Sequence, residues 1–323
     1  MLQQLTKVDT KLMNGKDSIT LSGAYFTAFL SKASKGDQLL VSINAAKDSM
    51  GQQAELGKAG SAVEVTFAVV QQNGKTTAVE QLEANAALSL EASGVRNSRL
   101  AAIYLIDQDG SHHLIESRLE AGVFTADISK PGIYAVLEYS KPFIDVAKTH
   151  WAYDYIQELS FHEVINGVDA DHYKPGTATT RAEFVKLIAG VLDLKPSGTA
   201  GSFLDVEKGK WYEDAIMAAV EAGIIQGVGD RKFDPNRRIT REEMAVILVK
   251  AYEYKKGSSN EAGSGGKPFK DADQISEWAK QAVAQAAALG MLEGQGNDLF
   301  APGKQATRAE CAKVIYKLME AAK

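Results

Sequence analysis

One pattern of residues occurs three times between residue 143 and the end of the chain, and this repeat constrains the fold more than any other feature. Each copy opens with Phe-x-Asp, at residues 143–145, 203–205 and 269–271, and a tryptophan follows. In every copy a glycine lies 16 residues after the tryptophan, an aromatic residue 22, a proline 24 and an arginine 30 residues after it. A unit of about 50 residues cannot bury its own apolar face, so the copies are expected to pack on one another. The pattern leaves open whether they stack as a solenoid or close as a pseudo-trimer.

Each copy is predicted to be a helix, a loop and a second helix. The first helix begins near the tryptophan, and the glycine, aromatic residue and proline are typical of a loop. The second helix begins at the Thr of a Thr-Arg-x-Glu motif, because Thr and Glu three residues apart form a capping box. The capping pairs are Thr180 and Glu183, Thr240 and Glu243, and Thr307 and Glu310. Apolar residues then recur at i, i+3, i+4, i+7 and i+8, which predicts one buried helical face. Cys311 stands on that face and is expected to be a buried hydrophobe rather than a nucleophile.

The spacing sets the expected boundaries of the repeats at 143–194, 203–254 and 269–321. Two segments of flexible composition separate them, residues 195–202 and 255–267, which are rich in Gly, Ser and Lys.

Residues 1–142 differ in character and are predicted to form an antiparallel β-sandwich. Short runs of β-branched and alternating apolar residues are separated by turn signals such as Asn73-Gly74 and Asp109-Gly110. The runs occur at 39–43, 61–70, 87–91, 99–106, 113–116, 122–128 and 132–139. No helical period is read in this part. The expected fold class is therefore α+β and multidomain, a β-sandwich followed by helical repeats.

Composition excludes several classes of function. Hydrophobic residues make up 45% and charged residues 24%, which is typical of a globular chain. The net charge of −5 argues against a nucleic-acid partner. No run of 18 apolar residues occurs, so no membrane insertion is expected. A single cysteine excludes an internal disulfide and a zinc site made of cysteines. No catalytic constellation, metal site or cofactor motif is found, so no enzymatic activity is assigned.

The combination of Phe-x-Asp-Val, Trp, Gly-Val, Phe-x-Pro and Thr-Arg-Ala-Glu resembles the S-layer homology domain over residues 143–321. The resemblance implies a pseudo-threefold bundle with grooves between neighbouring copies. It implies a module that attaches proteins non-covalently to the Gram-positive cell wall by binding a secondary cell wall polysaccharide. The ligand group it implies is a pyruvate ketal, typically on N-acetylmannosamine. The expected location is the cell surface, although the chain begins without the basic and apolar regions of a signal peptide.

The resemblance assigns carbohydrate binding to the arginine of Thr-Arg-x-Glu and the aspartate of Phe-x-Asp, with the tryptophan and glycine beside them. These residues are Asp145, Trp151, Gly167 and Arg181 in copy 1, Asp205, Trp211, Gly227 and Arg241 in copy 2, and Asp271, Trp278, Gly294 and Arg308 in copy 3. A guanidinium is a bidentate partner for the ketal carboxylate, and a sugar ring packs its C–H face on an aromatic plane. Free amides at the helix N-terminus are expected to share the anion with the arginine.

Structural alternatives exist for each residue type. The arginine can pair with an aspartate of another copy, the tryptophan can pack in the core, and the aspartate can cap the first helix. The glycines are expected to act partly as helix stop signals.

Copies 2 and 3 depart from the pattern. Copy 3 has Ala272 in place of Val, one extra residue between Asp271 and its tryptophan, and Gln295 after its glycine. Copy 2 reads Thr-Arg-Glu-Glu. We expect the grooves built from copies 1 and 2 to be the most competent, and the groove that relies on the Phe-x-Asp element of copy 3 to be weakened or silent. Two other functions are kept open: a self-assembling S-layer subunit whose β-domain makes lattice contacts, and an enzyme with its site in the β-domain or in a deleted upstream region.

Overall fold

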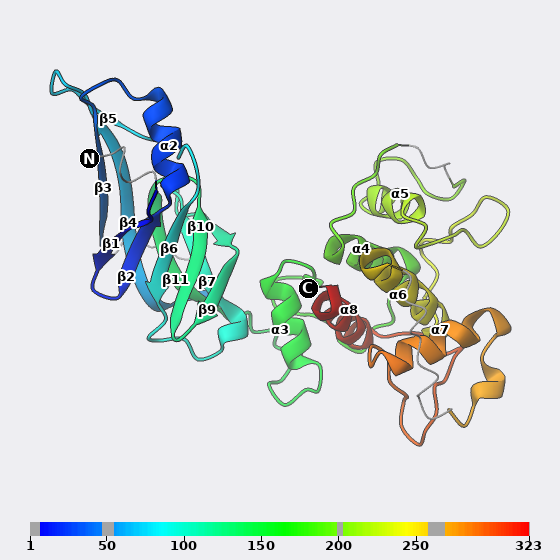
Figure 1. The fold of residues 1–323 in the computed structure, drawn as a ribbon. Coiled ribbons are helices and arrows are strands. Elements are labelled where there is room, and N and C mark those ends of the chain that lie inside the picture. Colours follow the sequence, from blue (N-terminus) through cyan, green and yellow to red (C-terminus); the bar gives the residue numbers. More distant parts are fainter. Residues whose placement is uncertain (1–6, 47–54, 199–202, 258–268, 323) are drawn as a thin grey trace. The chain divides into compact units, whose positions relative to one another are not determined.

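The computed structural model describes residues 7–46, 55–198, 203–257 and 269–322. The chain divides into two compact units, Met1–Lys141 and Pro142–Lys323 (Figure 1). Each is described by itself. Most of the two expected linkers, 199–202 and 258–267, lies outside the described residues. In the described part of the chain, no helix is both long and apolar enough to cross a lipid bilayer.

The first unit contains two antiparallel sheets, as the sequence predicts for residues 1–142. The strands of the first sheet, in spatial order, are β1 (Thr10–Asn14), β2 (Asp17–Leu21), β6 (Ala86–Glu91), β10 (Val123–Ile128) and β9 (Ser117–Glu120). The strands of the second are β3 (Gln38–Ala45), β4 (Leu56–Val70), β11 (Gly132–Tyr139), β7 (Ala101–Ile106) and β8 (His112–Ile115), with β5 (Thr76–Ala78) paired to β4. A 3₁₀ turn, Ser98–Leu100, leads into β7.

The two sheets share one hydrophobic core. Every second residue of β6 is buried, which is the alternation that a sheet with one covered face requires. Leu88 and Phe124 of the first sheet belong to the same buried cluster as Val65, Ile103 and Val136 of the second. The turn signals and alternation in the sequence therefore identified the architecture of this unit.

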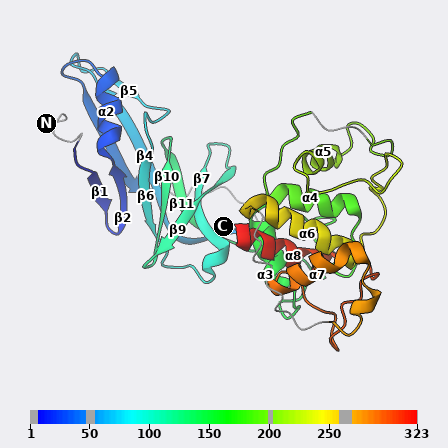
Figure 2. The ribbon, with the colours of Figure 1, turned by 45° about the vertical axis from the view of Figure 1, so that its right-hand side comes forward.

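The expectation that this unit has no helix is wrong. Helix α2 spans Gly23–Lys32 and lies near β5 in both ribbon views (Figures 1 and 2). The Ser22 hydroxyl caps it by accepting from the Tyr25 amide. Tyr25, Phe26 and Phe29 are buried in the core that the two sheets share. Ser followed by aromatic residues at i, i+1 and i+4 was the signal for this helix.

The second unit has three helix pairs, as the repeat predicts. Copy 1 contains α3 (Tyr153–Phe161) and α4 (Arg181–Val191). Copy 2 contains α5 (Glu213–Glu221) and α6 (Arg241–Lys256), the last of which extends into the expected linker. Copy 3 contains a 3₁₀ turn (Ala272–Gln274), α7 (Glu277–Ala288) and α8 (Arg308–Ala322).

The predicted capping boxes are confirmed in all three copies. In α4 and α6 the Thr hydroxyl accepts from the Glu amide while the Glu carboxylate accepts from the Thr amide. The same two bonds join Thr307 and Glu310, at 3.2 and 2.7 Å. Each second helix therefore begins at the arginine that follows the threonine.

The copies contact one another in a ring. The second helices α4, α6 and α8 pack on each other near the middle of the unit (Figures 1 and 2). Each first helix packs on the second helix of another copy: α5 on α4, α7 on α6 and α3 on α8. Copy 3 thus contacts copy 1 as well as copy 2, and one core runs through all three. Cys311 is buried in it, as predicted, with its sulfur 4.0 Å from that of Met244.

Candidate functional site: grooves between the repeats

The aspartate of each Phe-x-Asp motif fixes the loop that precedes the second helix. Asp145 accepts from the amides of Tyr173 and Lys174, at 2.9 and 2.7 Å. Asp205 binds the amides of Phe233 and Asp234, and Asp271 those of Phe300 and Ala301, in the same way. These aspartates were expected to cap the first helix. They instead bind amides of the loop that precedes the second helix. Asp271 makes both bonds despite the altered spacing of copy 3.

The loop bonds account for the ionisation of these carboxylates. Burial alone would raise the pKa of Asp271, but hydrogen bonds from two backbone amides and the charge of Arg241 bring that pKa below its ordinary value. The pKa values of Asp145 and Asp205 are lowered by the same pair of amide bonds, again against burial. In each loop, the second of the two residues whose amides bind the aspartate has a positive φ, and the pair of hydrogen bonds holds this conformation in place. These residues are Lys174, Asp234 and Ala301.

The glycines of the pattern are required by close packing, and their interpretation as helix stop signals is wrong. The first helices end at Phe161, Glu221 and Ala288, several residues before Gly167, Gly227 and Gly294. A Cβ on Gly227 would lie 2.6 Å from the Lys232 carbonyl oxygen and 2.7 Å from the Phe203 ring. The other two glycines face equivalent obstacles, a loop carbonyl and the ring that opens the motif. The glycine therefore lets the loop fold over this phenylalanine.

The arginine of each Thr-Arg-x-Glu motif crosses to the neighbouring copy. Nε of Arg181 donates to the Phe233 carbonyl at 3.1 Å, and the guanidinium lies 4.8 Å from the centre of that ring. The matching pairs are Arg241 with Phe300, at 2.8 and 5.0 Å, and Arg308 with Tyr173, at 2.7 and 4.4 Å. Each arginine thus combines a hydrogen bond with a cation–π contact across the interface.

The outer guanidinium nitrogens also meet partners in the neighbouring copy. Nη1 of Arg181 lies 3.3 Å from Glu243, and Nη1 of Arg241 lies 3.5 Å from Glu310. Burial lowers the pKa of both arginines, which are 5% and 3% exposed, while the glutamate charge raises it. The alternative that the arginine pairs with an acidic residue of another copy therefore holds for these two, with glutamate in the place of aspartate. Arg308 is half-buried, and its Nη2 donates to the Asn166 carbonyl at 2.9 Å.

The amides at the start of the second helices are not available to an anion, contrary to expectation. The Arg181 amide donates to the Arg237 carbonyl at 2.9 Å, and the Ala182 amide to the Pro235 carbonyl at 3.1 Å. Equivalent bonds begin α6 and α8. The third amide of each helix, that of the glutamate, donates to the capping threonine. The first amides of these three helices are therefore not the anion site.

The tryptophans do not pack in the core. Trp151, Trp211 and Trp278 are 54%, 53% and 58% exposed. The ring of Trp151 stacks on His150, with the centroids 5.6 Å apart, and the Lys186 ammonium lies 5.1 Å from the centre of the Trp211 ring. Each tryptophan therefore presents an open aromatic face.

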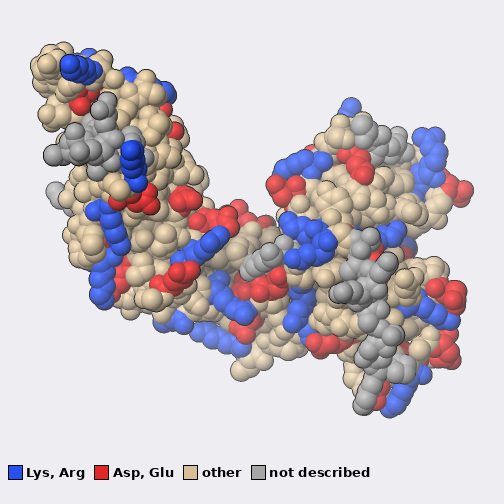
Figure 3. Space-filling view, in the orientation of Figure 1, with Lys and Arg blue, Asp and Glu red and all other residues tan. Residues whose placement is uncertain are grey.

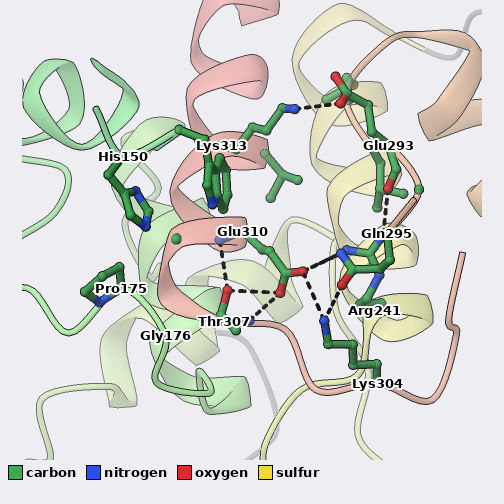
Figure 4. A pocket seen from close by; sticks show the side chains of 16 residues that line it. His150, Pro175, Gly176, Arg241, Glu293, Gln295, Lys304, Thr307, Glu310 and Lys313 are labelled. Carbon is green, nitrogen blue, oxygen red and sulfur yellow. Dashed lines mark hydrogen bonds and ion pairs between the residues drawn. The ribbon is translucent and has the colours of Figure 1, made fainter. Parts of the chain in front are cut away.

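The first groove, here called the Arg241 groove, has a volume of about 490 Å³ and takes residues from all three copies. Trp151 and Gly176 come from copy 1, Arg241 from copy 2, and Gly294 and Lys313 from copy 3. Figure 4 shows His150 and Pro175 on one side and Arg241, Glu293 and Gln295 on the other. Glu310 lies between them and accepts from Gln295 at 2.5 Å, and Lys313 pairs with Glu293 at 2.8 Å.

The second groove, the Arg308 groove, has a volume of about 160 Å³ and repeats this arrangement one copy further round the ring. Arg308 replaces Arg241, Trp211 replaces Trp151, and Lys186 replaces Lys313. The structure thus brings the arginine, the tryptophan and the glycine loop of three different copies to one place. Among the described residues that line the two cavities, none is an aspartate of the Phe-x-Asp motif.

Sequence reasoning missed the two lysines. Lys186 and Lys313 each lie 35 residues after the tryptophan of their own copy, five residues beyond the arginine. They are the polar residues between the apolar positions of the second helix, where a lysine is ordinarily solvated surface. Only the packing between copies turns these two side chains into groove walls.

Comparison with known proteins agrees with the repeat pattern. The model of the S-layer homology domain matches residues 142–185, 202–245 and 268–312. An amylopullulanase of Thermoanaerobacterium thermosulfurigenes is 34% identical over 97% of this chain. Exoglucanase XynX of Acetivibrio thermocellus is 44% identical over 57% of it, and the S-layer protein sap of Bacillus anthracis is 34% identical over 61%.

The similar segments are small parts of these relatives. The chain spans 17% of the amylopullulanase, 17% of the exoglucanase and 24% of the S-layer protein. Because the match to the amylopullulanase covers 97% of this chain, it includes both units. With three matches to one family model, a spacing kept after the tryptophan in every copy and the same loop and cap bonds in each, residues 142–185, 202–245 and 268–312 are three tandem S-layer homology domains.

Proposed function

We propose that this chain is the cell-wall attachment region of a longer surface protein, and that its repeats bind a pyruvylated secondary cell wall polysaccharide. The observation that carries the proposal is the pair of equivalent grooves, each with an arginine, a lysine and an exposed tryptophan from different copies. No step of chemistry is needed for attachment, so the repeats act as a binding module.

The chemistry of the groove suits an acidic sugar. The ketal of pyruvate carries a carboxylate, which a lysine ammonium and a guanidinium edge can bind. The tryptophan faces can pack on the C–H face of a sugar ring, and the loop carbonyls and glutamates can accept from its hydroxyls. N-acetylmannosamine bearing the ketal is the residue that this proposal assigns to the grooves.

The twelve residues expected from the resemblance divide into two roles in this proposal. The tryptophans and arginines form groove walls, and each arginine also joins two copies. The aspartates and glycines hold the loops in shape and position the walls. The ring of contacts between α3 and α8, α5 and α4, and α7 and α6 supports a closed pseudo-threefold bundle rather than an open stack.

The first unit is proposed to be part of the attachment region, without catalytic activity. Its similarity to the amylopullulanase extends through both units, whereas the similarity to the S-layer protein covers 61% of the chain. A role in a surface lattice is the second candidate, since several relatives are named S-layer proteins. The enzyme names of other relatives apply to proteins of which this chain matches less than a fifth.

Co-sedimentation with purified Gram-positive cell walls tests the proposal. The full chain should sediment with intact walls and stay in the supernatant with walls from which the secondary polysaccharide has been extracted. A Trp151→Ala, Trp211→Ala double variant is the matched protein control, because both side chains are exposed and their loss should leave the core intact. Equal sedimentation with extracted walls would contradict the proposal, and self-association without walls would favour the lattice role.

A further inference from the structure

We propose that the three grooves are not equivalent: the Arg241 and Arg308 grooves bind the acidic saccharide, and the third groove does not. The third groove, here called the Arg181 groove, is the position reached by one further step round the ring, with Arg181, Glu243 and Trp278 in the equivalent places. This inference rests on the proposed function and adds which binding positions are active. It also reverses the expectation that copies 1 and 2 make the most competent groove.

The first difference is the missing lysine. Lys186 and Lys313 line the two cavities described above, and Lys186 lies over a tryptophan ring. The residue at the same distance after Trp211 is Val246, which is half-buried and packs against the core. The Arg181 groove therefore lacks the flexible ammonium group that an anionic ligand would meet in the other two.

The second difference is an added carboxylate. Copy 2 has Glu242 where copies 1 and 3 have Ala182 and Ala309, and Ala309 lines the Arg241 groove. Glu242 accepts from both the amide and the hydroxyl of Ser276, at 3.0 and 3.1 Å. Because Ser276 precedes α7, these bonds tie the two walls of the Arg181 groove together next to Trp278. They also place a negative charge where the other grooves have a methyl group.

The third difference is that Arg237 of the Arg181 groove is bound by two carboxylates at once, Glu243 and Asp234. Arg237 donates to both oxygens of Glu243, at 2.6 and 3.0 Å, and its Nε donates to Asp234 at 2.9 Å. The equivalent residues, Thr177 and Lys304, make no such clamp: Lys304 lies 4.0 Å from Glu310. An anion entering the Arg181 groove would have to compete with two carboxylates for this guanidinium.

The balance of cations and carboxylates differs between the three grooves. In the Arg181 groove two cations, Arg181 and Arg237, face three carboxylates, Asp234, Glu242 and Glu243. In the Arg241 groove three cations, Arg241, Lys304 and Lys313, face two carboxylates, Glu293 and Glu310. In the Arg308 groove Arg308 and Lys186 face Glu183, which Arg238 also approaches at 3.9 Å. A carboxylate ligand is therefore favoured in two grooves and opposed in the third.

Calorimetric titration of the full chain with the methyl glycoside of pyruvylated N-acetylmannosamine tests this. The three tryptophans are a matched set of similar exposure: Trp151 and Trp211 line the Arg241 and Arg308 grooves, and Trp278 is the equivalent residue for the Arg181 groove. We expect two sites in the wild type, one after Trp151→Ala and one after Trp211→Ala, and an unchanged two after Trp278→Ala. Lys186→Met and Lys313→Met should each weaken one of the two sites about tenfold, the loss of one charge-assisted contact.

A gain-of-site variant tests the cause. Glu242→Ala combined with Val246→Lys restores the residues found in the other copies, and we expect the number of sites to rise from two to three. Three sites in the wild type, or a site lost with Trp278→Ala, would overturn the inference while leaving the proposed function intact. A stoichiometry of two in the gain-of-site variant would overturn the assignment to Glu242 and Val246. No heat with the wild type would contradict the proposed function itself.

Discussion

A guanidinium at the first position of a helix is opposed by the helix dipole and must be compensated by its surroundings. In this protein the compensation comes from the neighbouring copy: a carbonyl, an aromatic face and, for Arg181 and Arg241, a glutamate. The same arginines were predicted to recognise the ligand. Because these arginines are deeply buried, most of each guanidinium binds the neighbouring copy. Only the part of the guanidinium that is left can contact a ligand in a groove.

Replacing the loop aspartate tests its positioning role. Asp271→Ala removes the acceptor of two buried backbone amides, so we expect the free energy of unfolding of the second unit to fall by about 2 kcal/mol. Asp273→Ala, two residues away and exposed, is the control and should change it by less than about 0.5 kcal/mol. Equal effects in denaturant titrations would show that the two amide bonds contribute nothing measurable.

The pattern glycine is expected to tolerate no side chain. A Cβ on Gly294 would lie 2.7 Å from the Leu299 carbonyl oxygen, so Gly294→Ala should destabilise the second unit by about 1–3 kcal/mol. Gly303→Ala provides the comparison, because a Cβ there meets open space and Gly303 has no positive φ. Thermal melts of the two variants should differ by several degrees. Coincident melts would mean that the loop shifts at no cost.

At the scale of elements, ionised carboxylates cap the helices and bind the loops of the second unit. The stability of this unit is therefore expected to depend on pH. For Glu243 and Glu310, burial would raise the pKa, but hydrogen bonds and the arginine charges hold it below the ordinary value. A folded-state pKa below the unfolded one adds stability that is complete above about pH 4–5 and is lost as the pH falls through the folded value. The melting temperature should therefore fall between about pH 5 and pH 3.

The melting temperature of the second unit can be measured selectively, because all three tryptophans lie in that unit. Fluorescence, with circular dichroism at 222 nm, follows that unit during melts at different pH. Glu243→Gln should melt lower at neutral pH and show a shallower acid dependence, since the amide cannot carry the charge that Arg237 and Arg181 bind. A wild-type melting temperature that stays constant down to pH 3 would contradict this account.

Local patterns predicted the elements better than they predicted the interfaces. The capping boxes, the buried face that holds Cys311 and the strand runs are short-range signals, and all three correspond to the structure. Helix α2 was missed because it is short, and its three buried aromatic residues are too few to reveal a helical period. The groove lysines could not be predicted, because what surrounds Lys186 depends on a tryptophan from another copy. The expectation that free amides at the helix N-termini share an anion was wrong for the same reason, because carbonyls of another copy accept from these amides.

At the scale of the whole molecule, the helix contacts between the copies predict unfolding that differs from that of a stack of repeats. Helix α8 packs on α3 and also on α4 and α6. Removing copy 3, residues 258–323, should therefore uncover apolar faces in both remaining copies and abolish their cooperative unfolding. The first unit has its own core and should keep its β-sheet signal in circular dichroism. An open stack would instead lose one terminal repeat and retain a smaller cooperative transition from copies 1 and 2.

The described residues on the face that Figure 3 displays carry charges of both signs, without a region of one sign that would act at a distance. Figure 3 shows Lys and Arg interspersed with Asp and Glu over the face that it displays. Binding is therefore attributed to the grooves, where a few charges are partly shielded from solvent, rather than to long-range attraction. The first unit adds sheet edges and loops to which this account assigns no ligand.

The central claim is that the repeats recognise a sugar through its ketal carboxylate. Titration calorimetry of the full chain with pyruvylated N-acetylmannosamine, and with the same sugar lacking the ketal, tests it most directly. The account predicts saturable binding of the ketal and at least a hundredfold weaker binding of the plain sugar, because the loss of a charge-assisted bidentate contact is worth about 3 kcal/mol. Equal affinity for the two sugars would contradict it.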